Sequence, residues 1–381
     1  MSTFLLLFFT VYGGMHLYTY LKVRAAFPFG MATGMGLSLF MFFMVLSPIA
    51  IRYLERGGFE LPARWLALFG YSWMGLLLLF VSLSLTIDIV RLILYALSLV
   101  TKTDMSAFLP PATVRFFIPL LIAIVAAAYG FFEANNIRTE RVHISSPKIP
   151  REAGRIKIAQ ISDVHLGLIV REGRLSKILD VVRREQPHIL VSTGDLFDGQ
   201  AFEVDGISTL FEEIRPPLGK YAVTGNHEYF SGIERALDFA KRAGFVVLRG
   251  SGATISGLIN IAGVDDPAGR SRGQYREVSE EELLSNLPQE KFTLFLKHRP
   301  EVGGRSEGLF DLQLSGHTHR GQIFPFRFLV KLSYPYIAGL YTLEKGSKLY
   351  TSRGSGTWGP PFRVFSPPEV TIIELMHKEM K

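Results

Sequence analysis

The hydrophobic positions divide the chain into an apolar first part and a mixed second part. Four runs without charged residues lie within residues 1–135, at 4–21, 31–51, 65–87 and 116–132. Each run is close to the roughly 20 residues that a helix needs to cross a bilayer. No basic segment precedes the first run and three more follow it, which argues against a cleaved signal peptide. The pattern therefore predicts a transmembrane region of about four helices over residues 1–135.

The third run continues beyond its uncharged part. Asp88 and Arg91 follow it, and residues 89–100 are again apolar. This stretch is too short to cross back, because a helix rises only about 1.5 Å per residue. We therefore expect one helix that emerges from the bilayer or lies along its surface, with Asp88 and Arg91 paired on one face. We interpret Asp88 as an interfacial charge, and a functional intramembrane carboxylate is the alternative.

Basic residues near the apolar runs indicate the orientation. With four spans, the N-terminus, the second loop and the second part of the chain share one side of the membrane. Basic residues on that side are Arg52, Arg56, Arg64, Arg138, Arg141 and Lys148. Since cytoplasmic loops are enriched in Lys and Arg, we expect an integral membrane protein of a bacterial inner or plasma membrane, with its second part in the cytoplasm.

The second part alternates short apolar runs with amphipathic segments. Strands are expected at 156–161, 189–192, 220–223, 245–248, 258–262, 292–296, 312–314, 339–343, 348–351 and 370–375, and helices at 172–185, 208–214, 231–243 and 279–286. Early strand–helix alternation followed by strand-rich sequence predicts an α/β domain with mixed sheets over residues 155–376. Two prolines, a glycine and several charges at 145–154 indicate a linker, which we place over residues 136–154.

Composition narrows the chemistry and the partners. The chain has no cysteine, so any metal site must use nitrogen and oxygen donors. The formal net charge is +7, and the basic residues cluster near the ends of apolar segments, which suits anionic lipid headgroups. No basic run is interleaved with aromatic residues, so a nucleic-acid partner is not expected.

Five short polar motifs in the second part each follow an apolar run. They are Asp163-Val-His165, Gly194-Asp195, Gly225-Asn226-His227-Glu228, Lys297-His298-Arg299-Pro300 and Gly316-His317-Thr318-His319. Five of the nine histidines fall within them. In open α/β sheets ligands bind beyond the carboxyl ends of the strands, so the motifs are expected at one edge. Asp, Asn and His are side chains that hold pairs of metal ions, which are tools for attacking phosphorus.

The spacing within the motifs suggests how a metal pair is held. In an extended chain Asp163 and His165 point to the same side, and His317 and His319 repeat this arrangement. Asp195 can bridge two metals about 3.5–4 Å apart, because a carboxylate has two oxygens. Each motif alone is also compatible with a turn or a surface histidine. Their joint occurrence, in order, favours a two-metal centre.

These motifs together resemble those of the calcineurin-like metallophosphoesterase superfamily. The segments 262–266, 316–322 and 359–363 are similar to those of its bacterial membrane-associated branch. The resemblance covers about residues 155–376 and implies two β-sheets flanked by helices, with two divalent metals at the sheet edge. Combined with the apolar first part, it gives the expected fold class, which is four transmembrane helices followed by an α/β metallophosphoesterase domain.

The resemblance also implies a role for each site residue. One metal would be held by Asp163, His165, Asp195 and His319, and the other by Asp195, Asn226, His298 and His317. A hydroxide that bridges the metals would attack phosphorus, while His227 would stabilise the developing charge or protonate the leaving oxygen. Mixed nitrogen and oxygen donors suit Mn²⁺, which we expect, with iron, zinc or magnesium as alternatives.

An aromatic stretch at residues 323–336 follows the last motif and carries only two charges, Arg327 and Lys331. We interpret it as a lip that dips into the membrane interface, and packing of a core loop is the alternative. Arg320 and Arg363 are candidate phosphate contacts, or else members of structural ion pairs.

The expected function is a membrane-anchored phosphohydrolase or phosphodiesterase that cleaves a phosphate ester or pyrophosphate of a lipid-linked substrate. Some proteins of the branch look like UDP-diacylglucosamine pyrophosphohydrolases, but those relatives generally lack a membrane part. The alternatives are a tethered phosphatase or phosphodiesterase for soluble substrates, and a transporter or scaffold whose metallo-domain senses a ligand.

Overall fold

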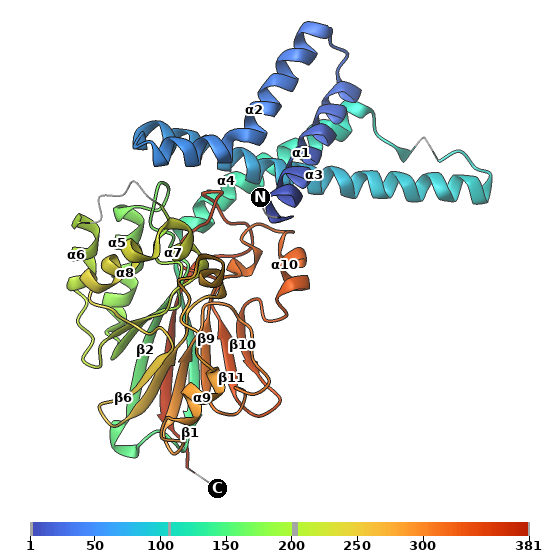
Figure 1. Ribbon diagram of the computed structural model, residues 1–381. Coiled ribbons are helices and arrows are strands. Elements are labelled where there is room, and N and C mark those ends of the chain that lie inside the picture. Colours follow the sequence, from blue (N-terminus) through green and yellow to red (C-terminus); the bar gives the residue numbers. More distant parts are fainter. Residues whose placement is uncertain (1–2, 106–107, 200–204, 380–381) are drawn as a thin grey trace. The chain divides into compact units, whose positions relative to one another are not determined.

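The computed structural model describes residues 3–105, 108–199 and 205–379. The chain forms two compact units, and Figure 1 shows their helices and strands. The helical unit comprises residues 1–132 together with 359–364, and the sandwich unit comprises residues 133–358 and 365–381. A short segment from late in the sequence thus belongs to the helical unit.

Four long helices dominate the helical unit. They are α1 (Thr3–Ala26), α2 (Met31–Arg56), α3 (Glu60–Thr101) and α4 (Ala112–Asn135), the last of which runs three residues into the sandwich unit. Among the described residues, α2, α3 and α4 are long and apolar enough to cross a membrane. The part of the chain that the structure describes thus holds three candidate spans, not the four that were predicted. The helix α1 forms as expected, and Lys22 and Arg24 follow its uncharged run.

The third helix is continuous, as the sequence predicted. It has 42 residues and is therefore about 63 Å long, roughly twice the thickness of a bilayer core. Asp88 on this helix pairs with Arg91 at 3.3 Å and with Lys22 of α1 at 2.6 Å, and it accepts a hydrogen bond from Tyr18 at 2.7 Å. These contacts give Asp88 a structural role in joining α1 to α3.

Two six-stranded mixed sheets form the sandwich unit. In spatial order the first sheet contains β1 (Arg138–Ser146), β12 (Glu369–His377), β2 (Arg155–Ile161), β3 (Ile189–Ser192), β4 (Lys220–Ala222) and β5 (Val246–Val247). The second contains β10 (Gly339–Thr342), β11 (Lys348–Thr351), β9 (Leu312–Ser315), β8 (Phe292–Leu296), β7 (Ile259–Gly263) and β6 (Ser251–Ile255). Strands β2 to β5 are parallel, and so are β7, β8, β9 and β11.

Alternating side chains build the layers. Ile156 and Ile158 of β2 join a core that also contains Leu294 and Leu312 of the second sheet, so the two sheets pack face to face. Ala159 and Ile161 of β2 point the other way, into a second core. The helices α5 (Glu172–Glu185), α6 (Asp205–Glu212) and α8 (Ile233–Arg242) supply side chains to this second core and cover the outer face of the first sheet. The helix α9 (Glu280–Ser285) packs against the second sheet through Leu284.

The structure contains elements that the sequence pattern did not indicate. Strand β1 lies inside the predicted linker 136–154 and pairs in parallel with β12, from Arg138 opposite Glu369 to Ser146 opposite His377. Strand β6 and the short helices α7 (Asn226–Ser231) and α10 (Arg327–Ser333) were also missed, as were the 3-10 turns η2 (Arg151–Ala153), η3 (Pro267–Arg272) and η4 (His319–Gly321). The first sheet therefore begins within the segment assigned to the linker.

Candidate metal centre

The five polar motifs lie where strands end, as predicted. Asp163 follows β2, Asp195 follows β3 and Asn226 follows β4, and these three strands are parallel. His298 follows β8 and His317 follows β9, which are parallel in the second sheet. The carboxyl ends of both sets of strands thus deliver their side chains to one edge of the sandwich.

One group of donor atoms forms around Asp163, His165 and His319. One ligand atom from each of the three side chains lies within 4.8 Å of the others, and all three residues are buried. The Nε2 atoms of His165 and His319 face each other at 3.0 Å, and His319 Nε2 lies 3.5 Å from Asp163 Oδ1. Two imidazole nitrogens that face each other this closely require a proton or a cation between them.

A second group forms around Asp195, His298 and His317. His298 Nε2 lies 3.3 Å from Asp195 Oδ2, 3.1 Å from His317 Nδ1 and 3.2 Å from Asn226 Oδ1. Asp195 Oδ2 also lies 3.8 Å from His165 Nε2 of the first group. The carboxylate of Asp195 is therefore positioned between the two groups, where a bridging ligand belongs.

The backbone of the motifs differs from the extended chain that the spacing argument assumed. Asp163, His165, Asp195, His317 and His319 all have positive φ angles, between 47° and 70°. Left-handed backbone is costly for residues other than glycine, and such residues cluster at functional sites. The alternate positions still converge, but through tight left-handed turns rather than through extended strands.

Close backbone approach explains the glycine of the last histidine motif. A Cβ atom at Gly316 would collide with the side chains of Ser162 and Asp163. The backbone N–H of the next residue, His317, donates to Asp163 Oδ1 at 2.9 Å. The first and the last motif are thus in direct contact across the two sheets.

The side chain of Glu228 joins two of the motifs through hydrogen bonds to their backbone. Its buried carboxylate accepts hydrogen bonds from the backbone N–H groups of Gly225, Asp195, Leu196 and Phe197, at 2.7–3.1 Å. The motif that contains Asn226 forms the first turn of α7, where a carboxylate at this position also favours the helix N-terminus. Glu228 therefore fixes the loop after β3 against the loop after β4.

His227 lies beside the first group and is held by a carboxylate that the sequence analysis missed. Its Nδ1 lies 3.0 Å from Asp198 Oδ1, and His165 Nδ1 lies 3.5 Å from the other oxygen of Asp198. Because Asp198 follows Asp195 by three residues, proximity to the motif was the only signal in the sequence. One carboxylate thus orients a predicted ligand and the predicted catalytic histidine.

Buried carboxylates make this edge favourable for positive charge. Although burial lowers the pKa of His298, the carboxylate of Asp195 raises it to about 10. In the same way burial lowers the pKa of His227, but Asp198 and then Asp195 raise it to about 9. Nitrogen and oxygen donors in two groups, with a shared carboxylate and a preference for positive charge, fit two divalent cations.

Comparison with known proteins agrees with this geometry. Residues 156–321 match the family model described as calcineurin-like phosphoesterase. A metallophosphoesterase of Aquifex aeolicus is 41% identical over 261 residues, which cover 68% of this chain and 99% of that protein. The chain belongs to the calcineurin-like metallophosphoesterases. Members of this family are metal-dependent phosphoester hydrolases that bind two divalent metals, so the chain is an enzyme of that class.

Two further metallophosphoesterases extend the similarity beyond the metal centre. One, from Campylobacter jejuni, is 34% identical over 299 residues, which cover 78% of this chain and 78% of that protein. The other, from Danio rerio, is named a transmembrane protein with metallophosphoesterase domain and is 31% identical over 268 residues, or 67% of this chain and 61% of that protein. The name of this relative joins a transmembrane protein to a metallophosphoesterase domain, and this chain combines such a domain with helices long and apolar enough to cross a membrane.

The structure gives the surroundings of the two arginines that were predicted to contact phosphate. Arg320 lines a cavity with Arg353 and Glu369, and no predicted metal ligand lines that cavity. Arg363 belongs to the helical unit, where it is fully buried and its backbone N–H donates to Gly130 O at 3.1 Å. Contact of either arginine with a phosphate therefore stays a prediction.

The aromatic stretch contacts the metal centre through one residue that the sequence analysis did not single out. Tyr334 Oη lies 2.9 Å from His317 Nε2 and 3.4 Å from Arg299 Nη1. Tyr334 directly follows α10, and Arg299 is itself paired with Asp266. The position of α10 is thus linked to the orientation of a predicted metal ligand.

Proposed function

We propose that this metallophosphoesterase is a membrane-anchored phosphohydrolase or phosphodiesterase that cleaves a phosphate ester or pyrophosphate of a lipid-linked substrate. We further propose Mn²⁺ as its metal, a bacterial inner or plasma membrane as its location, and a cytoplasmic sandwich unit. The membrane part of this proposal is supported by α2, α3 and α4, which are each apolar and long enough to span.

The ligand set suits an anionic substrate. Asp163, His165, Asp195 and His319 would hold one metal, and Asp195, Asn226, His298 and His317 would hold the other. When bound, the cations would supply Lewis-acid polarisation of the phosphoryl group and a lowered pKa for water. Two carboxylates against two divalent cations leave the centre positive, so that a phosphate group is attracted.

His227 can hold a proton for the leaving oxygen. Its Nδ1 faces Asp198, so the proton available to a substrate is the one on Nε2. Burial lowers the pKa of His227, but the carboxylates of Asp198 and Asp195 raise it to about 9 in the metal-free chain, which favours a proton on the imidazole. The rings of Phe230 and Trp358 lie edge-on to the imidazole at 5.5 and 5.7 Å, and both rings are partly exposed. An apolar wall thus borders the position expected for the leaving group.

The observation that carries the lipid proposal is the exposed apolar surface of α10 beside the metal centre. Phe328, Leu329 and Leu332 are 56%, 59% and 83% exposed, while Tyr334 at the end of the same helix contacts His317. Phe324 packs against Phe328 and carries the guanidinium of Arg327 on its ring. Exposed large apolar side chains grouped at a site indicate a contact surface, and a lipid interface would bury them.

A comparison of lipid and soluble substrates tests this proposal. Replacing Phe328, Leu329 and Leu332 together by Ser should lower kcat/KM on a lipid-linked phosphate by about tenfold or more, since each buried side chain contributes about 1.5–3 kcal/mol. Hydrolysis of bis(p-nitrophenyl) phosphate should be unchanged, as should both activities of the control Val246→Ser, which alters an exposed residue of β5. Equal losses on both substrates would contradict the lipid proposal and favour a tethered enzyme for soluble esters.

A further inference from the structure

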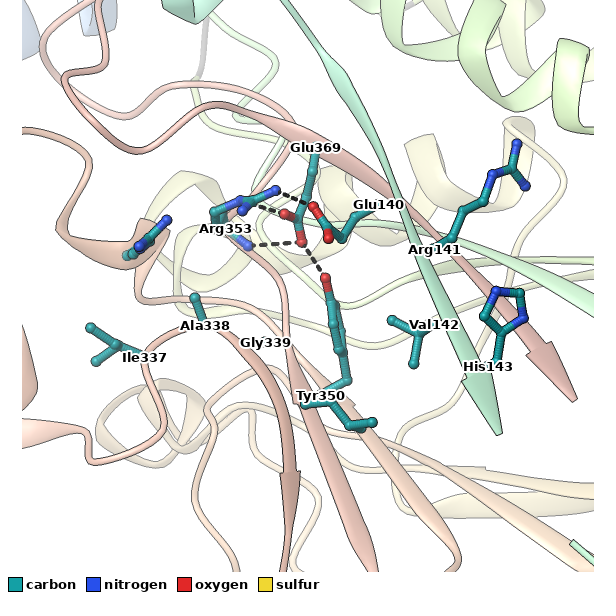
Figure 2. Close-up of a pocket in the computed structure, with 12 residues that line it drawn as sticks. Glu140, Arg141, Val142, His143, Ile337, Ala338, Gly339, Tyr350, Arg353 and Glu369 are labelled. Atoms are coloured by element: carbon teal, nitrogen blue, oxygen red, sulfur yellow. Dashed lines mark hydrogen bonds and ion pairs between the residues drawn. The ribbon is translucent and has the colours of Figure 1, made fainter. Parts of the chain in front are cut away.

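A cavity of about 570 Å³ lies between the edge strands of the two sheets, apart from the predicted metal ligands. Figure 2 shows it between β1, which carries Glu140 and Val142, and the segment from Ile337 to Gly339 that leads into β10. Its volume is within the range of small-molecule sites. The cavity therefore has room for a ligand that the metal centre does not involve.

The acidic groups of the cavity are already paired. Glu369 Oε1 accepts hydrogen bonds from Tyr350 Oη at 2.8 Å and from the backbone N–H of Arg353 at 3.3 Å, and the guanidinium of Arg353 pairs with the other oxygen. The same guanidinium reaches Glu140 Oε2 at 2.7 Å, so that Arg353 bridges both carboxylates, as Figure 2 shows. Glu369 and Tyr350 are almost fully buried, which makes this network a fixed wall.

Arg320 adds a further cation to the same cavity. In the part of the chain that the structure describes, its guanidinium makes no ion pair with a carboxylate, in contrast to Arg353. Arg141 and His143 also line the cavity, but they pair with Glu185 and Glu374. The cavity thus contains one guanidinium that is available for an anion.

The remaining lining is apolar. Val142, Ile337, Ala338 and Leu340 contribute aliphatic side chains to the cavity. A ligand that matches both features has an anionic group for Arg320 and an aliphatic portion beside it. Guanidinium groups bind phosphate through two parallel N–H···O bonds, which makes phosphate esters well matched to such a site.

We propose that this cavity is a binding site for a phosphate monoester with an aliphatic substituent, held by Arg320. The same chemistry is present in the headgroup of phosphatidic acid and in a free alkyl phosphate. One wall of the cavity is linked to the metal centre, because Thr318 Oγ1 donates to Ile337 O at 2.7 Å and Tyr334 lies three residues earlier. Occupation of the cavity would therefore stabilise the segment between α10 and β10.

Binding to metal-free protein tests this proposal independently of hydrolysis. The full chain, treated with EDTA so that the metal centre cannot retain phosphate, is titrated calorimetrically with butyl phosphate and with inorganic phosphate. Butyl phosphate should bind more tightly, because inorganic phosphate cannot use the aliphatic lining. Arg320→Gln should weaken butyl phosphate binding about tenfold or more, since a hydrogen bond to a charged group is lost.

Arg327→Gln is the matched control. It removes the same charge from nearby α10, but Arg327 stacks on Phe324 and Phe328 and does not line the cavity. This variant should bind butyl phosphate as the wild type does, and both variants should keep the wild-type melting temperature. No binding by the wild type, an unchanged Kd for Arg320→Gln or an equal loss for Arg327→Gln would overturn the proposal.

A competition experiment shows whether the ligand is a lipid headgroup or a free ester. Nanodiscs that contain phosphatidic acid should displace butyl phosphate if the cavity binds a lipid headgroup, whereas displacement only by soluble alkyl phosphates assigns it to a free ester. Either result supports the binding site. This binding test uses metal-free protein and does not depend on hydrolysis. If the metal-loaded enzyme failed to hydrolyse lipid, the proposed function would be overturned while the binding result would stand.

Discussion

Asp195 lies between the two groups of donor atoms of the metal centre. One of its oxygens lies between His298 and His165, and the other accepts a hydrogen bond from the backbone N–H of His227 at 2.8 Å. Burial of its carboxylate raises its pKa, but the nearby His298, His227 and His165 together hold that pKa well below the usual range. A change at this position is therefore expected to disturb both donor groups together.

His227 can act either as a general acid or as a metal ligand, and one variant can distinguish these two roles. It belongs to a third group of donor atoms with His165 and Asp195, and it is also paired with Asp198. We predict that His227→Ala lowers kcat roughly 100-fold or more, the usual contribution of general acid catalysis, while two metals per chain remain bound. The measurements are steady-state hydrolysis of a soluble ester and elemental analysis of the same sample.

The control for this prediction is His377→Ala, which removes a histidine at the end of β12 that contacts the backbone of Ile149 and the side chain of Arg151. This variant should retain full activity. If His227→Ala instead loses one of the two metals, His227 is a ligand rather than an acid, and the assigned role is wrong.

The residues of the site were predictable because each motif combines a strand end with side chains of one chemistry. All seven predicted ligands and His227 come together at one edge. Asp198 and Tyr334 were missed, since their importance depends on which side chains the fold places beside them. The left-handed backbone of the ligands was missed as well, because nothing in an Asp-x-His pattern specifies φ.

At the scale of elements, the strands that were predicted are those with continuous apolar runs. Strands β3, β8 and β9 are buried on both faces and read as apolar stretches. Strand β1 is an edge strand in which buried Val142 and Ile144 alternate with exposed charged residues. Its charges, and the prolines that follow it, gave it the composition of a linker.

The position of β1 in the first sheet leads to a stability prediction. Ile144 is almost fully buried between the sheets, so Ile144→Ala should lower the free energy of unfolding by about 2–5 kcal/mol. Unfolding by guanidinium chloride can be followed through Trp358 in a Trp65→Phe, Trp73→Phe background, because the chain has three tryptophans. If residues 138–146 were only a linker, Ile144→Ala would not lower the free energy of unfolding.

Thr139→Ala provides the comparison within the same strand. Thr139 is exposed on β1, so its replacement should change the free energy of unfolding by less than about 0.5 kcal/mol. If the two variants unfold at the same denaturant concentration, β1 does not contribute to the sandwich core.

At the scale of the whole molecule, the sequence correctly separated an apolar helical part from an α/β part. Among the described residues three helices, rather than the four predicted, are long and apolar enough to cross a membrane. The segment 359–364 was assigned to the phosphoesterase domain, but it belongs to the helical unit. Sequence order alone cannot show that a late segment returns to an early domain.

The absence of cysteine allows the proposed orientation to be tested without background labelling. In spheroplasts, Thr103→Cys in the segment between α3 and α4 should react with a membrane-impermeant maleimide. Ser285→Cys at the end of α9 should react only after permeabilisation, because α4 would separate it from Thr103. The reverse pattern would contradict a cytoplasmic sandwich unit, and labelling of both in intact spheroplasts would contradict a spanning α4.

The most direct test of the central claim is turnover of native lipids. Full-length protein with Mn²⁺ is incubated with fractionated bacterial membrane lipids, and consumed and released species are identified by mass spectrometry beside the matched variant Asp195→Ala. We predict that the wild type consumes a phosphate-containing lipid and that Asp195→Ala leaves it intact. The claim would be contradicted if the wild type hydrolysed soluble phosphate esters but no lipid fraction, or if Asp195→Ala consumed the lipid equally well.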